Sequence, residues 1–161
     1  MISAIVAVNN DWGIGYNGDL LEHIPEDLKY FKTLTTGHII VMGSKTWDSL
    51  PKKPLPDRLN IVITHNERHF DAMTAFIDLN EAIIRLKMAD DECFIIGGGS
   101  IYKQLLPICD RVYVTKIYTS HSNVDTYFPN LDEQEDWTAT PVAPPQDYKD
   151  FKYQFWQYDR R

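Results

Sequence analysis

The chain has 161 residues, 43% of them hydrophobic and 24% charged, which is the composition of one ordinary globular domain over residues 1–161. Its formal net charge of -7 argues against a nucleic-acid partner, because binding to a phosphate backbone depends on clustered Lys and Arg. Cys93 and Cys109 lack metal-ligand spacing, and no apolar run has membrane-spanning length, so we expect a metal-free cytoplasmic protein, monomeric by default.

The first half of the chain alternates predicted strands and helices. Residues 2–8 are a nearly continuous apolar run, typical of a central strand buried on both faces. Residues 9–24 contain three glycines and no sustained period, so they predict one long loop that is a candidate lid. Pro25 suits the first position of a helix and acids follow it, which predicts a helix start. Buried strands are expected at residues 39–42 and 59–63.

The second half of the chain moves from helices to strands. Asp78 to Glu81 resembles a capping box that opens an amphipathic helix through Met88. Residues 93–102 then predict a strand, a turn of three glycines and another helix. Later strands are expected at residues 111–118, 137–142 and 153–158. We therefore predict a single-domain α/β fold, with a central, mostly parallel twisted sheet of about eight strands, antiparallel C-terminal strands and about four flanking helices.

Two strand-to-helix junctions that contain glycine point to a dinucleotide. A turn without side chains, such as Gly97 to Gly99, lets backbone N–H groups approach a pyrophosphate, and the following helix N-terminus favours an anion. Alone this signal is weak, because Tyr102 replaces the third glycine of the dinucleotide fingerprint and a plain structural turn explains the glycines equally well. Gly43 supplies a second junction, and ligands of open α/β sheets lie beyond the carboxyl ends of strands.

Polar residues after two predicted strands favour NADP over NAD. An acid near the adenosine ribose favours NAD, whereas a cationic or hydroxyl-rich pocket suits the 2′-phosphate of NADP. Neither Ser44-Lys45-Thr46 nor Thr64-His65 contains an acid. The alternative is that Lys45 and His65 are merely solvated surface groups.

Asp27 shares a helical face with Phe31 and Leu34 and lies beside Leu28. A carboxylate on an otherwise apolar face is unusual and suits the anchoring of a ligand. Alternatively, an acid in the first turn only stabilises the helix dipole. The spacing alone leaves both interpretations open.

Several motifs, in their order and spacing, carry a resemblance over essentially the whole chain. They are Gly13-Ile14-Gly15, Pro25 to Phe31, Met42 to Trp47, Leu55 to Arg58, Ile96 to Tyr102, Thr115, and Asp125 to Pro129. Together they resemble the bacterial-type dihydrofolate reductase family. The resemblance implies an oxidoreductase of one-carbon metabolism that passes hydride from C4 of NADPH to C6 of 7,8-dihydrofolate, with protonation at N5, to give tetrahydrofolate.

The resemblance implies a pocket for the substrate, dihydrofolate. Asp27 would accept hydrogen bonds from the pterin edge with Thr115 supporting its carboxylate, while burial would raise its pKa. Arg58 would bind the α-carboxylate of the glutamate tail, although a loop arginine in water is the bland alternative. The remaining contacts are expected from Ile5, Ala7, Leu28, Phe31, Leu50, Leu55 and Ile96.

The resemblance also implies a site for NADPH. The pyrophosphate would lie on Gly97, Gly98, Gly99, Ser100 and Ile101, and the adenosine end on Ser44, Lys45, Thr46, Thr64 and His65. Other contacts are expected from Ala7, Ile14, Gly15, Leu20, Gly43, Ile96, Tyr102, Gln104 and Thr126, with Tyr102 near the nicotinamide. The loop holding Gly15 and Leu20 would close over the nicotinamide and exclude water, and Asp125 would steady it.

Glu22 departs from the family pattern. Leu20-Leu21-Glu22 stands where the family usually has Leu-Pro-Trp, so an acid replaces an indole near Asp27. Leu20 and Glu22 therefore join Asp27 and Thr115 as candidate catalytic residues. If Glu22 points inward, two carboxylates share one site and one pKa rises. We expect it to point to solvent, because burying an unpaired carboxylate is costly.

Other departures concern the lid and the cofactor phosphate. Val124 stands where glycine usually precedes Asp125, which we expect to change lid motion. Ser44 and Ser100 replace arginines of many relatives, so the 2′-phosphate would depend on Lys45 and His65. With a changed lid, we expect diaminopyrimidine antifolates, inhibitors of the family, to bind poorly.

Two other functions are compatible with parts of the sequence. A related-fold reductase acting on a ribosylaminopyrimidine would keep the glycine turn, but it has no need for Asp27, Phe31 and Arg58 at pterin and glutamate positions. A module that binds folate or NADPH with little turnover is conceivable, given the changes at Glu22 and Val124.

Overall fold

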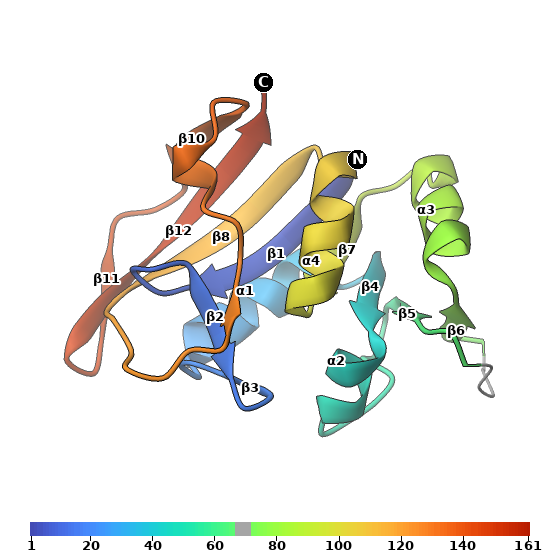
Figure 1. Cartoon of the computed structure of the whole chain (residues 1–161), viewed down its shortest axis with the longest axis horizontal. Helices are drawn as coiled ribbons and strands as arrows, with labels where there is room; N and C mark the ends of the chain where they lie inside the picture. Colours follow the sequence, from blue (N-terminus) through green and yellow to red (C-terminus); the bar gives the residue numbers. More distant parts are fainter. Residues whose placement is uncertain (67–71) are drawn as a thin grey trace.

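The computed structural model describes residues 1–66 and 72–161 (Figure 1). Its strands are β1 (Ile2–Val8), β2 (Gly13–Tyr16), β3 (Asp19–Leu20), β4 (Ile39–Gly43), β5 (Leu59–Ile63), β6 (Thr74–Ile77), β7 (Cys93–Gly97), β8 (Arg111–Tyr118), β9 (Thr126–Tyr127), β10 (Trp137–Pro141), β11 (Gln146–Tyr148) and β12 (Phe151–Arg160). Its helices are α1 (Pro25–Thr35), α2 (Ser44–Ser49), α3 (Leu79–Met88) and α4 (Gly99–Leu105), with short 3₁₀ turns at Leu106–Ile108 and Leu131–Glu133.

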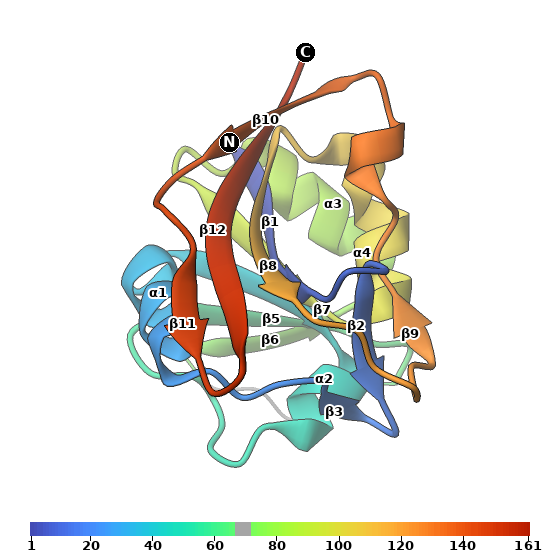
Figure 2. The same ribbon diagram turned by 90° about the vertical axis from the view of Figure 1, so that its left-hand side faces the viewer.

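The described strands form one main sheet in the order β10-β12-β8-β1-β7-β4-β5-β6, with β11 paired to β12. The pairs from β8 to β6 are parallel, whereas β12 runs antiparallel to β8, β10 and β11. Figure 2 shows β12, β8 and β1 side by side. The predicted α/β class, the central place of β1 and the antiparallel C-terminal strands are confirmed.

Local signals set the starts of two helices. Pro25 is the first residue of α1, as predicted, and Glu26 and Asp27 follow in its first turn. Asp78 caps α3, because its side chain accepts a hydrogen bond from the backbone N–H of Glu81 at 2.8 Å. The predicted helix through Met88 is confirmed.

The prediction of one irregular loop over residues 9–24 was wrong. β2 and β3 form a hairpin, and β9 joins them to make a separate small sheet at the carboxyl end of β1. Gly13 pairs with Tyr127, so this segment is ordered by contacts far along the chain. β6 and β11 were not predicted either.

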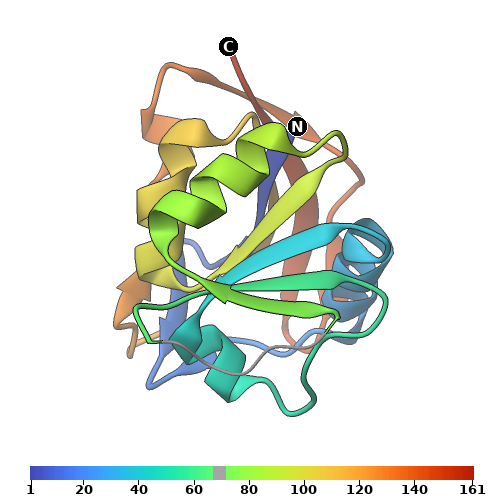
Figure 3. The same ribbon diagram turned by 90° about the vertical axis from the view of Figure 1, so that its right-hand side faces the viewer.

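The core lies in layers on the two faces of the sheet. Ala82 and Leu86 of α3, with Ile101 and Leu105 of α4, cover one face, and Figure 3 shows the two helices next to each other, with α1 away from them across the strands. Side chains of α1 and α2 pack against a second cluster that includes Ile5, Ile40, Met42, Val62 and Phe94. Each such buried side chain contributes about 1.5–3 kcal/mol. None of the helices described is long and apolar enough to cross a bilayer.

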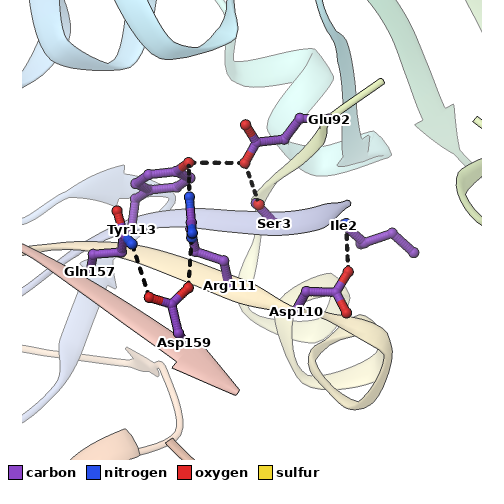
Figure 4. A network of polar contacts seen from close by, with 8 residues as sticks. All are labelled: Ile2, Ser3, Glu92, Asp110, Arg111, Tyr113, Gln157 and Asp159. Carbon is purple, nitrogen blue, oxygen red and sulfur yellow. Dashed lines mark hydrogen bonds and ion pairs between the residues drawn. The ribbon is translucent and has the colours of Figure 1, made fainter. Parts of the chain in front are cut away.

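A polar network ties the amino ends of β1 and β8 to β12 (Figure 4). Ser3 and Tyr113 donate hydroxyl hydrogen bonds to one carboxylate oxygen of Glu92, at 2.6 and 2.9 Å. Arg111 donates to Tyr113 and, at 2.7 Å, to Asp159. Arg111 and Asp159 form an ion pair and Glu92 accepts from two hydroxyls, so these polar side chains serve to hold the strands together.

Candidate functional site

The two glycine junctions lie side by side at the carboxyl edge of the sheet. β4 and β7 are parallel neighbours with Met42 paired to Gly97, so Gly43 and the glycine turn open α2 and α4 next to each other. A Cβ atom on Gly98 would lie 3.4 Å from the Thr46 hydroxyl oxygen, across the gap between the two helix starts. Adjacent helix N-termini lined by glycine backbone form a surface suited to an anion.

Gly97 needs glycine for two reasons. Its φ is +123°, a region that side chains rarely adopt, and a Cβ there would lie 3.2 Å from the Tyr102 ring. Tyr102 is buried and donates its hydroxyl hydrogen to the Ile5 carbonyl at 2.6 Å, and burial raises its pKa. Its ring packs on Phe128, which stacks on Trp12. Tyr102 therefore supports the turn from within the protein.

The first turn of α4 is also covered by β9. A Cβ on Gly99 would lie 2.5 Å from the methyl carbon of Thr126, a distance that excludes any larger residue without movement. The Thr126 hydroxyl donates to Asp125, and Gln104 donates its amide hydrogens to the Ser100 hydroxyl and carbonyl oxygens. These predicted cofactor residues lie together around the glycine turn.

The residues expected at the adenosine end also meet. β4 and β5 are parallel neighbours, with Gly43 paired to Ile63. Ser44, Lys45 and Thr46 begin the helix after β4, and Thr64 and His65 follow β5 directly. Lys45 and His65 are exposed, so both side chains are available to a phosphate group.

Asp27 and Thr115 form the polar centre of the second part of the site. The Thr115 hydroxyl, on buried β8, donates to a carboxylate oxygen of Asp27 on α1 at 2.6 Å. Desolvation raises the pKa of Asp27, and the Thr115 hydrogen bond lowers it by a smaller amount. An acid that served only the helix dipole would not need this partner 88 positions away.

Apolar side chains gather on the same face as Asp27. Five of the seven residues expected as pocket walls belong to one cluster, namely Ile5, Phe31, Leu50, Leu55 and Ile96. Leu28 is 54% exposed on α1, and Ala7 packs instead with the cluster of Ile24 and Ile117. The cluster and the carboxylate combine apolar side chains with a polar anchor, as is typical of the lining of small-molecule sites.

Arg58 is not a solvated loop arginine. It is only 4% exposed, and its guanidinium donates to the Pro56 carbonyl at 2.8 Å and to the Thr35 hydroxyl at 3.1 Å. It lies 6.0 Å from the centre of the Phe31 ring. Desolvation lowers its pKa, but a guanidinium keeps its charge at neutral pH. A fixed cation at the edge of the apolar cluster suits an anionic ligand group.

Asp125 fastens the first half of residues 13–24, the segment that we expect to act as a lid and here call the lid segment. One of its carboxylate oxygens accepts from the Asn17 backbone N–H at 2.8 Å, which lowers the pKa of Asp125, and its own N–H donates to the Gly15 carbonyl. A Cβ on Gly13 would lie 2.8 Å from a methyl carbon of Val124. Val124 therefore packs directly on the base of the lid.

The expectation that Glu22 points to solvent was wrong. Its carboxylate lies 2.8 Å from Nε2 of His121, and the two side chains are 21% and 18% exposed. Glu22 does not contribute to the raised pKa of Asp27, which has burial as its main cause. Sequence reasoning missed His121 because it lies in a polar loop with no period or motif.

The profile of the dihydrofolate reductase family matches residues 1–160. The chain belongs to the dihydrofolate reductase family. The dihydrofolate reductase of Bacillus subtilis (strain 168) is 39% identical over 166 residues, covering 100% of this chain and 95% of that protein. The dihydrofolate reductase of Heliothis virescens is 36% identical and covers 83% of the chain and 82% of its own length.

A solved dihydrofolate reductase structure has the same fold. The enzyme from Enterococcus faecalis, complexed with NADP(H) and RAB-propyl, superposes with a TM-score of 0.83 at 30% identity. The alignment covers 100% of this chain and 96% of that one. The dihydrofolate reductase fold therefore extends over the whole chain, including the glycine turn and the small sheet of the lid.

Proposed function

We propose that this member of the dihydrofolate reductase family reduces 7,8-dihydrofolate to tetrahydrofolate with hydride from NADPH. The observation that carries the proposal is the hydrogen bond between half-buried Asp27 and buried Thr115 next to a cluster of apolar side chains, together with the two adjacent glycine junctions of the same sheet. These features support a pterin anchor and a dinucleotide site in one protein. NADPH supplies the hydride, and the residues of the chain bind, orient and protect the reacting groups.

Asp27 anchors the pterin in this proposal. Its carboxylate accepts from the 2-amino group and the ring N–H, a pair of donors that matches two carboxylate oxygens. The Thr115 hydroxyl fixes the orientation of that carboxylate and opposes the rise in its pKa. A bound pterin adds donors, which favours the ionised form further. The proton for N5 then arrives through water near this carboxylate.

The substrate lies along the apolar cluster in this proposal. Phe31, Leu50 and Leu55 contact the aromatic part, with Ile5, Ala7, Leu28 and Ile96 completing the walls. Arg58 binds the α-carboxylate of the glutamate tail, and its bonds to Pro56 and Thr35 hold the guanidinium in place beforehand. Orientation fixed before binding reduces the entropy lost on binding.

NADPH lies across the glycine junctions in this proposal. The absence of Cβ atoms at Gly43 and Gly99, where Ile101 and Thr126 leave no room for them, supports close approach of a pyrophosphate to the backbone. Gly97, Gly98, Ser100 and the start of α4 hold that group, with Tyr102, Gln104 and Thr126 around them. The 2′-phosphate lies toward Ser44, Lys45, Thr46, Thr64 and His65.

The lid excludes water from the reacting atoms in this proposal. Ile14, Gly15 and Leu20 cover the nicotinamide, and Leu20, which is 51% exposed, gains most contact area when the cofactor binds. The working unit in this proposal is a monomer. Both cysteines are free and buried, which supports action in the reducing cytoplasm.

The test is the loss of NADPH absorbance on addition of dihydrofolate, with NADH as the control cofactor. Wild-type protein is expected to turn over and to prefer NADPH, and Asp27→Asn to lose most of its activity because a neutral amide cannot hold the pterin edge in the same way. Binding of both ligands without turnover would support the binding-module alternative and contradict the proposal.

A further inference from the structure

His121 is a partly buried hydrogen-bonding group that the proposed reaction does not use. It lies in the connection between β8 and β9, and its Nε2 is 2.8 Å from the Glu22 carboxylate, two residues beyond β3. Its Nδ1 is 3.1 Å from the amide nitrogen of Asn9, at the end of β1. His121 therefore joins three segments of chain around the lid.

The partners of Asn9 decide the tautomer of His121. The Asn9 side-chain oxygen accepts from the backbone N–H groups of Asp11 and Gly13, at 2.9 and 2.8 Å. The amide nitrogen must then face His121 and donate to Nδ1, so Nδ1 carries no proton. Nε2 carries the hydrogen and donates it to Glu22. Each hydrogen-bond donor of the Asn9–His121–Glu22 chain thus faces an acceptor.

The bond to Glu22 holds the half of the lid that Asp125 does not reach. β2–β9 pairing and Asp125 fasten residues 13–17. Beyond Leu20, the hydrogen bonds seen from the described parts of the chain to the body of the protein that involve a side chain are Glu22 with His121, and the exposed Tyr148 hydroxyl with the His23 carbonyl. Ile24, at the end of the segment, is buried against Ile117 and Tyr153. Of the two hydrogen bonds, the one to Glu22 is closer to Leu20 and is more buried.

We propose that His121 is a positioning residue for hydride transfer. It acts through Glu22 to hold the second half of the lid segment, which includes Leu20, over the nicotinamide. The inference rests on the proposed function, because it assigns a task to His121 within that reaction. It also explains why an acid is accommodated at position 22, since His121 supplies the donor that a half-buried carboxylate requires.

Three substitutions at two adjacent positions isolate this role. His121→Leu removes both hydrogen bonds, and His121→Gln restores an amide donor toward Glu22. Ser120→Ala is the matched control, because Ser120 accepts from Asn10 at 3.2 Å between the same two loops but does not contact the lid. The variants are compared with wild type in single-turnover reduction of dihydrofolate, with NADPH and with NADPH deuterated at C4.

We expect His121→Leu to slow the isotope-sensitive step about tenfold, the factor typical of one hydrogen bond to a charged group. The KM for dihydrofolate should stay within about twofold, because Asp27 and Arg58 are untouched. His121→Gln should recover most of the rate, and Ser120→Ala should match wild type. In the double variant with Glu22→Leu, the loss should be no larger than in His121→Leu alone, because both changes remove the same contact.

The outcomes separate this inference from the proposed function. A wild-type protein without NADPH-dependent turnover contradicts the proposed function, whatever the variants do. If wild type turns over and His121→Leu transfers hydride as fast, the positioning role is overturned. Equal losses in His121→Leu and His121→Gln, accompanied by equal falls in melting temperature, indicate a purely structural residue and overturn it too.

A spectroscopic measurement keeps the inference testable if His121→Leu does not fold. Nitrogen-15 NMR of wild-type protein, with His121→Gln used to assign the signal, reports which ring nitrogen of His121 carries hydrogen at neutral pH. We expect the Nε2–H form with its hydrogen on Glu22. A dominant Nδ1–H form contradicts the contact on which the role depends.

Discussion

Replacing Asp27 by Asn is expected to stabilise the ligand-free protein at neutral pH. Burial raises the pKa of Asp27 above that of an aspartate in the unfolded chain, so folding favours the protonated form. Well below a pH of about 3.9 the carboxyl is neutral in both states and does not affect stability. As the pH rises from the unfolded-state pKa of about 3.9 to the raised folded-state pKa, stability is lost, and the loss is complete above the folded-state pKa. An amide carries no charge at any pH and can still accept from the Thr115 hydroxyl.

The magnitude is that of a small single-site change. Single substitutions commonly change stability by about 0.5–3 kcal/mol, and Asp27 is only half-buried, so we expect a gain of about 1 kcal/mol at neutral pH. For a chain of this size that raises the melting temperature by about 2–4 °C. The gain should shrink as the pH falls toward 4.

Thermal melts of ligand-free wild type and Asp27→Asn, followed by circular dichroism between acid and neutral pH, measure this effect. Glu135→Gln is the control, because it removes the same charge from an exposed position. It should leave the melting temperature unchanged. A neutral-pH melting temperature for Asp27→Asn at or below that of wild type, or a gain that does not depend on pH, refutes the reasoning.

Three further substitutions test the binding residues. Arg58→Lys should raise the KM for dihydrofolate about tenfold or more, because an ammonium cannot replace a guanidinium fork. A pteridine without the glutamate tail should bind equally well to wild type and variant. Weaker binding of this truncated ligand to the variant as well would contradict the assignment. Lys45→Ala should reduce the preference for NADPH over NADH, as measured by the ratio of kcat/KM values, and an unchanged ratio would contradict a role for Lys45 at the 2′-phosphate. Gly99→Ala should weaken NADPH binding in a direct titration and destabilise the fold by about 1–3 kcal/mol, because its methyl group meets Thr126; normal affinity and stability would show that this turn tolerates a side chain.

Features set by neighbouring residues could be predicted from the sequence. The start of α1 at Pro25 and the cap of α3 by Asp78 depend on interactions within one helical turn. The central strand Ile2–Val8 follows from its apolar run. In these cases the residues that decide the structure lie in the same short window.

Features set by distant contacts could not be predicted. β2 has four residues, and it is ordered by pairing with β9 more than a hundred positions away. The orientation of Glu22 depends on His121, 99 positions along the chain, so our prediction that Glu22 points to solvent was wrong. The burial of Arg58 likewise depends on Thr35 of α1. Such pairs leave no periodic signal in a single sequence.

The row of rings from Trp12 through Phe128 to Tyr102 connects the base of the lid to the underside of the glycine turn. Trp12 is buried, and the Lys116 ammonium lies 5.8 Å from the centre of its ring. Indole emission responds to nearby charge and to small changes in packing. This protein therefore carries its own optical reporter, and movement of the turn or the lid should be readable as a change in intrinsic fluorescence, without an attached dye.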